Sequence, residues 1–540
     1  MTDNKSSYSI GIVLLAMLLG LVLGIMFAPK LDPAYWGGRQ ETDNLLNSRV
    51  NTLMHIVDEY YVDTIDYDSL SNLMMNAMLS TLDPHSCYLS PEDFAKESEM
   101  ITGTFEGIGV TLFYYNDTVY ANNVIAGGPA SQAGIQPGDR IMYVDTTLVS
   151  GVGMTRNSQD VISLIRGPRG SSVTLAVQRG GSTQLHKVKV QRNVIPHTSI
   201  PAAVMLDRNT GYILISRFAE STGTEFHTAL QSLLDKGMKR LVLDLRNNGG
   251  GSLASAIEVC DELLPRRDLI VYTQGAHERR HDYYATSGGL FEQGGLTVMV
   301  NEHSASASEI VSGAIQDNDR GTVVGRRTFG KGLVQRQFDL PGEAAALLTI
   351  ARYYTPSGRC IQRPYAKGSD DYYLSYLTRL MGDLDAADSV LADQGDTSEC
   401  YLTKQGRKVY GGGGILPDRV LTLMTDTLLV YYNNMIDKNV FEHAVFDELF
   451  AHCDQLRRQY PDADSFVRNF RVSDTTWQRI LHKADAAGLN RNAASIAKYG
   501  DEMRGRYKAL LAFALYGDNA YYQCYLPFDS ELTRTVNGGR

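Results

Sequence analysis

The 540-residue sequence is poor in cysteine. Its six cysteines, spread over the whole length without a C-x-x-C pair, are Cys87, Cys260, Cys360, Cys400, Cys453 and Cys524. This spacing excludes a zinc ribbon and a disulfide-dense scaffold, and we expect no metal site. Because spacing does not give connectivity, zero to three disulfides remain compatible with the six thiols.

Clustered positive charge is also missing. Lysine and arginine total 51 against 61 aspartates and glutamates, so the net charge is -10. No basic block is long enough to bind a run of phosphates, and nucleic acid is therefore not an expected partner. The composition, 43% hydrophobic and 21% charged, excludes wholesale disorder and fibrous architectures. At about 150 residues per domain, the length suggests three or four folded units.

Long apolar runs are absent after residue 30, but one lies at the start. Residues 10–28 read IGIVLLAMLLGLVLGIMFA, without a charge. A helix of this length covers roughly 28 Å, close to the hydrocarbon thickness of a bilayer. A signal peptide would have a shorter apolar run and a small-residue cleavage site. The pattern favours an uncleaved anchor within residues 1–30, although balanced flanking charges decide its orientation only weakly.

The periodicity of the sequence changes along the chain. Residues 44–100 place apolar side chains at helical spacing, and Pro84 interrupts that pattern. Residues 101–195 contain short β-type runs, such as RIMYVD and SVTLAVQR, between Gly, Pro and Asp turns. We therefore predict a helical N-terminal domain followed by a compact β unit.

Strands and helices alternate in residues 196–365, where the expected strands include GYILISRF, LVLDL, LTVMVN, TVVG and ALLTIARYY. This alternation predicts an α/β layer structure with a largely parallel sheet and catalytic loops at the carboxyl ends of its strands. Residues 366–414 turn polar, which indicates an insertion or linker, and the chain returns to the core by residue 420. Residues 421–540 are predicted to be helical again.

A cluster of small residues lies between the strand LTVMVN and a predicted helix. It reads NEHSASASE from Asn301 to Glu309. Small residues let the backbone approach a substrate, and the free N–H groups of a helix start stabilise negative charge, so a serine here is a candidate nucleophile. Ser306 and Glu309 also fit a capping box, which needs no chemistry. This stretch alone favours the capping box.

Lys331 lies between two glycines, after TVVG and before LVQRQF. A lysine replaces histidine as the base for a serine only where burial lowers its pKa enough to keep it neutral. The alternatives are a surface lysine in a turn or part of a phosphate-binding loop, although GKG differs from the GK[ST] of a Walker motif. Histidine competes poorly as the base, because His277 and His281 lie apart from the serine cluster and only His303 is near it in the sequence.

A triple glycine, ending at Gly251, follows the strand LVLDL and the residues Arg246-Asn247-Asn248. Consecutive glycines turn backbone amides toward an anion, either a phosphate or the oxyanion of acyl transfer. The spacing is not the G-x-G-x-x-G of a dinucleotide site, and we expect no cofactor.

In this order and separation, the three stretches resemble the C-terminal processing peptidases, also called tail-specific proteases, which are serine peptidases with a Ser–Lys dyad. The match covers residues 45–425 and rests on LDPHSCYL, FEGIGVTL, LVLDLRNNGGG, VNEHSASASEIVSGAIQD, VVGRRTFGKGLVQ, ARYYTPSGRCIQ and GGILPD. It implies a multidomain α/β plus β chain. A membrane helix and helical N-terminal region precede a PDZ domain, a ClpP/crotonase-like peptidase core and a helical C-terminal extension.

In that family the nucleophile precedes the lysine by 25 residues, which selects Ser306 for Lys331 rather than Ser304 or Ser308. The resemblance implies acyl transfer, in which neutral Lys331 takes the Ser306 proton and the alkoxide attacks a peptide carbonyl. Water then releases the acyl-enzyme.

Three further residues follow from the resemblance. Gln335, four residues after the lysine, is expected to position it. The backbone amides of Gly251 and Ala307 are expected to form the oxyanion hole.

The β unit resembles a PDZ domain in FEGIGV and GPASQAGIQPGDRI. The resemblance implies that backbone amides of Gly107, Ile108 and Gly109 hold a terminal carboxylate while the peptide adds as an edge strand. Arg166 resembles an arginine that couples PDZ position to the active site. The expected substrates are exported proteins with apolar C-termini.

Two other functions compete with endopeptidase activity. One is a catalytically silent, membrane-tethered PDZ scaffold, against which the joint presence of Ser306, Lys331, Gln335 and RNNGGG argues. The other is an acyl-CoA hydratase-like enzyme, which the PDZ unit and the apolar segment make improbable. By resemblance we expect a single-pass protein of the inner membrane with its catalytic part in the periplasm. The helices of 421–540 are expected to mediate homo-oligomer formation or adaptor docking.

Overall fold

The computed structural model describes residues 48–115, 117–151, 158–286, 288–385, 399–422 and 426–538. It divides the chain into two compact units, Met1–Met75 and Asn76–Arg540. The predicted anchor at residues 10–28 lies outside the described residues, and no helix within them has the length and apolar character needed to cross a bilayer. All six cysteines fall in the described part, where each is a free thiol.

The first described elements are helical. A helix covers residues 48–60, and α3 (Tyr67–Ser80) and α4 (Pro91–Thr102) follow it. The chain turns between α3 and α4, where the short strand β1 (Cys87–Leu89) follows Pro84. The predicted interruption of the helical pattern at Pro84 is therefore confirmed.

The β unit is built on a six-stranded antiparallel sheet. Its main strand order is β3 (Val110–Tyr115), β4 (Thr118–Val124), β5 (Arg140–Val144), β7 (Ser172–Gln178) and β8 (His186–Gln191), with β6 (Thr147–Leu148) paired to β5. Helices α5 (Pro129–Gln132) and α6 (Ser158–Ile165) complete the unit. Strand β2 (Thr104–Gly107) pairs with β9 (Asn193–Pro196) where the chain enters and leaves it. Alternate residues such as Val173, Leu175 and Val177 are fully buried, so period-2 alternation defines its core.

The α/β core contains the predicted, largely parallel sheet. Its strand order is β10 (Ala202–Met205), β11 (Thr210–Leu214), β12 (Arg240–Asp244), β15 (Gly295–Val300), β16 (Thr322–Gly325) and β21 (Arg419–Val420), and only β10 is antiparallel to its neighbour. The helices that follow its strands are α7 (Thr222–Asp235), α8 (Leu253–Leu263) and α9 (Ala307–Asp317). Leu241 and Leu243 of β12 share one buried cluster with these helices, whereas Val242 belongs to a cluster on the other face.

The stretch ALLTIARYY was expected in this parallel sheet, and that expectation is wrong. It forms β18 (Ala344–Tyr354) of a second, antiparallel sheet with β1, β13 (Leu269–Gln274), β14 (His281–Tyr284) and β17 (Leu333–Leu340). β17 and β18 are separated only by residues 341–343, where Gly342 and Glu343 have φ of 79° and 60°. So short a connection makes a hairpin, because a parallel pair needs a crossover of about a dozen residues.

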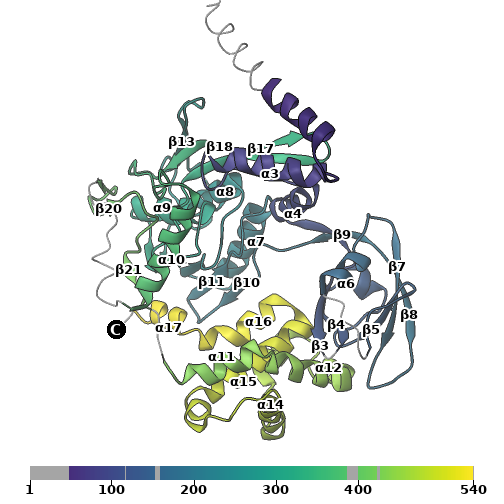
Figure 1. Cartoon of the computed structure of the whole chain (residues 1–540). Coiled ribbons are helices and arrows are strands. Elements are labelled where there is room, and N and C mark those ends of the chain that lie inside the picture. The colour runs from purple at the N-terminus through teal and green to yellow at the C-terminus, as the bar shows by residue number, and fades with distance from the viewer. Residues whose placement is uncertain are drawn as a thin grey trace, which may run out of the picture. The chain divides into compact units, whose positions relative to one another are not determined.

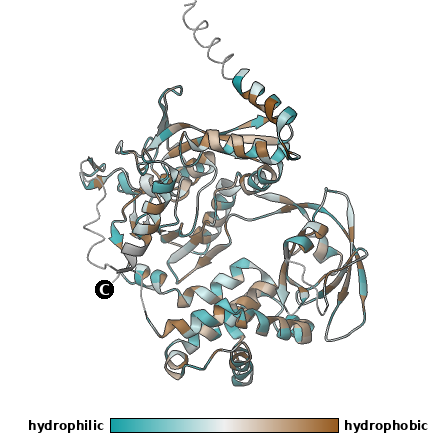
Figure 2. Cartoon of the chain, in the orientation of Figure 1, coloured by the Kyte–Doolittle hydropathy of each residue, from teal (hydrophilic) through white to brown (hydrophobic). Residues whose placement is uncertain are grey.

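The C-terminal extension is a helical layer that packs on both the PDZ unit and the core (Figure 1). Its elements are α11 (Leu429–Asp437), α12 (Val440–Gln459), α13 (Ala463–Asn469), α14 (Asp474–Ala486), α15 (Ala493–Tyr516), α16 (Asp518–Tyr525), η2 (Leu526–Phe528) and α17 (Ser530–Val536). The helices carry both hydrophobic and hydrophilic residues along their length (Figure 2). Phe446 of α12 stacks on Phe113 of β3, with ring centroids 4.6 Å apart. Leu526 and Leu532 join Val242 in the second cluster, so the extension covers the other face of the parallel sheet.

The polar stretch 366–414 contains defined structure on both sides of its undescribed part. Helix α10 (Ser369–Asp385) precedes residues 386–398, and the hairpin β19 (Cys400–Leu402) and β20 (Lys408–Tyr410) follows them. Gly411, Gly413 and Gly414 at its end are packed rather than linker-like, and a side chain on Gly414 would lie 2.5 Å from the Thr328 carbonyl oxygen.

Candidate active site

Ser306 lies at a sharp turn between β15 and α9. Its φ is 54° and its ψ is -115°, a backbone conformation that side-chain-bearing residues rarely adopt and that costs about 1–3 kcal/mol. Ser304 and Ser308 are fully buried, and their hydroxyls donate to the carbonyls of Leu245 at 2.8 Å and Asn248 at 2.9 Å. Ser306 is only partly buried. Of the three serines, Ser306 is therefore the one that a substrate can reach.

Glu309, in the first turn of α9, connects the serine turn to the lysine loop. Its fully buried carboxylate accepts hydrogen bonds from the backbone N–H groups of Ser306 at 2.9 Å, Gly330 at 2.8 Å and Lys331 at 2.9 Å. The Thr328 hydroxyl also donates to it. Burial raises the pKa of Glu309 to about 7, although these four donors favour the charged form. The predicted capping box is present, and it also holds the backbones of both candidate catalytic residues.

Lys331 is positioned by a polar relay. Its Nζ donates to Gln335 Oε1 at 2.6 Å, and Gln335 Nε2 donates to the carbonyl oxygen of His85 at 2.7 Å. Because the amide nitrogen of Gln335 is engaged by His85, its oxygen must face the lysine. Burial lowers the pKa of the Lys331 amine, while the carboxylates of Glu97 and Asp83 oppose that shift. A lysine in this environment can act as a neutral base.

His85 is a site residue that sequence reasoning missed, because the stretch DPHS was interpreted only as the end of a helix. The Asp83 carboxylate accepts the N–H groups of His85 and Ser86, both at 2.8 Å, and so fixes the carbonyl that holds Gln335. The His85 ring lies 3.1 Å from the Tyr372 hydroxyl. Burial, followed by the nearby Lys331 charge, lowers the pKa of His85 to about 4, so its ring is neutral at pH 7. The motif LDPHSCYL, which contains His85, was the sequence feature that could have indicated this role.

The triple-glycine loop packs directly against the serine turn. Asn248 is fully buried, donates from Nδ2 to the Ile215 carbonyl at 2.8 Å, and accepts the Gly250 N–H at 2.8 Å. Gly250 has a φ of 103°, and a Cβ there would lie 2.7 Å from Ser306 Cβ. Only glycine permits this close approach.

Two backbone amides beside Ser306 are available to an oxyanion. Within the described residues, neither the Gly251 N–H nor the Ala307 N–H donates to a protein acceptor, whereas the Gly250 N–H is engaged by Asn248. Gly251 has a φ of 136°, and a Cβ there would lie 2.1 Å from the Phe218 carbonyl oxygen. Two unengaged donors next to a partly exposed serine are what stabilisation of a tetrahedral intermediate requires.

Helix α10 covers the lysine loop, which the sequence did not indicate. Phe329 packs on Tyr376 with ring centroids 4.8 Å apart, and the Arg363 guanidinium lies 4.0 Å from the Tyr372 ring. Arg379 donates to the Thr328 carbonyl at 3.0 Å. The polar stretch after residue 366 therefore contributes to the site.

The predicted carboxylate loop of the PDZ unit lies between β2 and β3. Gly107 ends β2, Ile108 and Gly109 are buried, and Gly109 has a φ of 76°. Among the described residues, the N–H groups of Ile108 and Gly109 find no protein acceptor. Arg166 bonds Glu99 of α4 at 2.8 Å and 3.0 Å, and its guanidinium lies 4.9 Å from the Phe105 ring. These contacts join the PDZ unit to α4, not to Ser306 or Lys331.

The sequence is similar to those of known proteins. The profile of peptidase family S41 matches residues 209–368, that of the PDZ domain matches 120–179, and a family of unknown function (DUF8443) matches 431–517. The carboxy-terminal-processing protease of Bartonella bacilliformis is 34% identical over 322 residues, which cover 58% of this chain and 72% of the relative. The carboxyl-terminal-processing protease of a Synechocystis species is 35% identical over 298 residues, with coverage of 53% and 67%. The solved photosystem II D1 C-terminal processing protease is 29% identical, with a TM-score of 0.32 and coverage of 56% of this chain and 81% of that chain.

Proposed function

The chain belongs to peptidase family S41 as a serine peptidase of the carboxy-terminal-processing type, and we propose that Ser306 is its nucleophile and Lys331 its general base. The observation that carries this assignment is the shared carboxylate of Glu309, which accepts the backbone N–H groups of both residues. A single buried group thus fixes the two segments that acyl transfer must bring together.

The reaction follows from the protonation state of the lysine. Neutral Lys331 Nζ takes the proton from Ser306 Oγ as that oxygen bonds to the carbonyl carbon of the scissile peptide. The resulting oxyanion is held by the N–H groups of Gly251 and Ala307. Lys331 returns the proton to the leaving amine, and the C–N bond breaks. Water then attacks the Ser306 ester, with the lysine again as base, and releases the acid.

We propose that the PDZ unit selects substrates by their C-termini. The unengaged N–H groups of Ile108 and Gly109 support a carboxylate site, and β3 is an edge strand that a peptide can extend. Because Arg166 lies beside Phe105 of the loop and bonds Glu99, an arriving carboxylate would compete with Glu99 for the guanidinium. The proposed ligands are apolar C-terminal peptides.

We propose that the chain is anchored in the inner membrane by residues 10–28, with its catalytic part in the periplasm and with exported proteins as substrates. The uncharged apolar run supports the anchor, and the family resemblance supports the orientation. We also propose that the amphipathic helices of 421–540 mediate homo-oligomer formation or adaptor docking.

A serine-reactive fluorophosphonate and an unfolded substrate with an apolar C-terminus test the assignment. Wild-type protein should be labelled once, at Ser306, and should degrade the substrate, whereas Ser306→Ala should do neither. Ser308→Ala is the matched control, because it removes a neighbouring buried hydroxyl and should keep the labelling. Degradation by Ser306→Ala would disprove the assignment. A wild-type protein that binds peptide without labelling would instead be a silent scaffold.

A further inference from the structure

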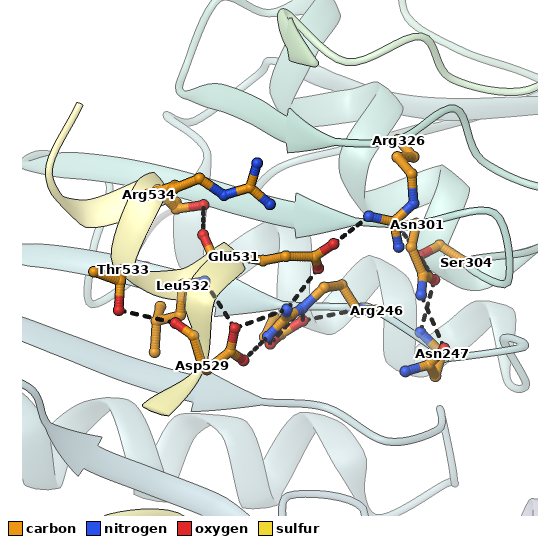
Figure 3. Close-up of polar contacts among 12 residues, drawn as sticks. Arg246, Asn247, Asn301, Ser304, Arg326, Asp529, Glu531, Leu532, Thr533 and Arg534 are labelled. Carbon is orange, nitrogen blue, oxygen red and sulfur yellow. Dashed lines mark hydrogen bonds and ion pairs between the residues drawn. The ribbon is translucent and has the colours of Figure 1, made fainter. Parts of the chain in front are cut away.

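Helix α17, near the C-terminus, brings two carboxylates onto an arginine of the oxyanion loop (Figure 3). Arg246 begins the stretch RNNGGG. Its guanidinium bonds Asp529 Oδ2 at 2.6 Å and Glu531 Oε2 at 2.8 Å, and also Asp244 Oδ2 at 2.6 Å. The Arg246 side chain is only 14% exposed, so water screens these contacts little.

The second oxygen of Glu531 reaches the lysine loop. Glu531 Oε1 accepts a hydrogen bond from Arg326, which lies at the start of the stretch RRTFGKG (Figure 3). Arg326 Nε also donates to Glu302 Oε2 at 2.7 Å, and Glu302 follows the strand that leads to Ser306. The Glu531 carboxylate therefore bridges Arg246 of the triple-glycine loop and Arg326 of the lysine loop. Arg326 in turn bonds Glu302 of the serine loop.

This cluster lies beyond the carboxyl ends of three neighbouring parallel strands. β12 ends at Asp244, β15 at Val300 and β16 at Gly325, and each is followed by one of the three loops. The Arg326 N–H additionally donates to the Val300 carbonyl at 3.1 Å. Relative movement of these loops would change the distance between the serine, the lysine and the oxyanion donors.

Helix α17 is itself firmly placed. The Asp529 carboxylate caps it by accepting the Leu532 N–H at 2.9 Å, and acidic residues in a first turn are favoured by the helix dipole. Leu532 is buried against the parallel sheet, and Arg419 of β21 donates to the Thr535 carbonyl at 2.8 Å. The helix can therefore hold its carboxylates still.

We propose that Glu531, assisted by Asp529, is a positioning residue for peptide hydrolysis, which fixes the oxyanion loop relative to the lysine loop through Arg246 and Arg326. This inference rests on the proposed roles of Ser306, Lys331 and Gly251. In this role neither carboxylate contacts the substrate. A misplacement of about 1 Å in such a site costs about 10²-fold in rate, so a clamp across two loops has a direct kinetic consequence.

Glu531→Gln tests the clamp, because it keeps the shape of the side chain and removes its charge. We expect kcat and the rate of fluorophosphonate labelling to fall by about 10- to 100-fold. KM and the Kd of a C-terminal peptide for the PDZ unit should stay within about twofold, because no substrate contact changes. Asp501→Asn is the matched control: its carboxylate on α15 is 94% exposed, and it should leave all four quantities unchanged.

Glu531→Asp provides a second variant should Glu531→Gln not fold. It keeps the charge but is one methylene shorter, so it cannot span both arginines, and its labelling rate should also fall by about tenfold. The proposal would be overturned if a folded Glu531 variant kept the kcat and labelling rate of the wild type. It would also be overturned if the substitution raised KM alone. If the wild-type protein itself is not labelled at Ser306, the proposed function fails instead, so the two failures are distinguishable.

Discussion

The serine turn and the lysine loop meet at Glu309 but are stabilised in different ways. Around Ser306, the neighbouring serines and Asn248 form fully buried contacts with adjacent loops of the parallel sheet. Lys331 instead depends on Gln335 and on the carbonyl of His85, which is 250 residues away from Gln335 in the sequence. The proposed nucleophile is thus fixed by the core, whereas the proposed base also depends on elements added around the core.

At the serine turn the structure sets a position, whereas at the lysine loop it also sets a protonation state. Strain and glycine packing, which involve no titrating group themselves, set the position of the Ser306 backbone. The lysine must also be neutral, which requires burial beneath its surroundings. Changes at the lysine loop should therefore alter pH dependence, whereas changes at the serine turn should alter rate alone.

Loss of the base should have the largest effect. Lys331→Ala should lower kcat by about 10⁴-fold without a change in peptide binding, because it removes the proposed acceptor of the serine proton. Lys331→Arg is the informative companion, since an arginine keeps a positive charge and never deprotonates at working pH. Peptide hydrolysis by the arginine variant at more than a trace rate would show that lysine is not the base.

Glu309→Gln should damage both regions at once. The amide nitrogen of glutamine would face N–H donors that the carboxylate now accepts, so we expect a loss of about 2–3 kcal/mol in stability and about 10²-fold in kcat. Thermal unfolding and steady-state kinetics measure the two effects. Thr328→Val, which removes one donor and leaves the carboxylate in place, should be much milder; equal effects would argue against a special role for the carboxylate.

Gln335→Leu sharpens the distinction between position and charge. Since burial lowers the pKa of Lys331, the rate should rise with pH as the amine deprotonates and level off above that pKa. Leucine removes an acceptor that favours the charged amine, so the rising limb should move to lower pH while the plateau falls by about tenfold. The measurement is the pH profile of kcat/KM for the wild type and the variant. A rising limb that moves to higher pH in the variant would contradict the role of Gln335 in holding Lys331.

Glu99→Gln should have the smallest effect, because it lies outside both regions. The ion pair with Arg166 is partly exposed and contributes little to stability, about 1 kcal/mol or less. We expect a change of a few-fold in the activity stimulated by C-terminal peptides, with unchanged hydrolysis of a short substrate that does not engage the PDZ unit. A loss on both substrates would place Glu99 with the catalytic loops instead.

The sequence anticipated the elements that carry local signals. Helical and period-2 patterns placed α7, α8 and most core strands, since the pattern is read within each element. β18 was misplaced because its residues suit either sheet, and its partner is decided by the short connection to β17. His85 was missed because its role depends on a backbone carbonyl, which no side-chain motif reveals.

By itself, the sequence determined the order of the parts, the alternation of the core and a spacing between Ser306 and Lys331 that matches a known peptidase family. Only the tertiary structure decided that the capping-box carboxylate of Glu309 also holds the lysine loop, that α10 covers that loop, and that the C-terminal helices form a layer of the core. It alone brought Asp529 and Glu531 to Arg246 and Arg326. The physical reason is that burial and ion pairing depend on contacts between segments hundreds of residues apart, whereas periodicity is a property of neighbours.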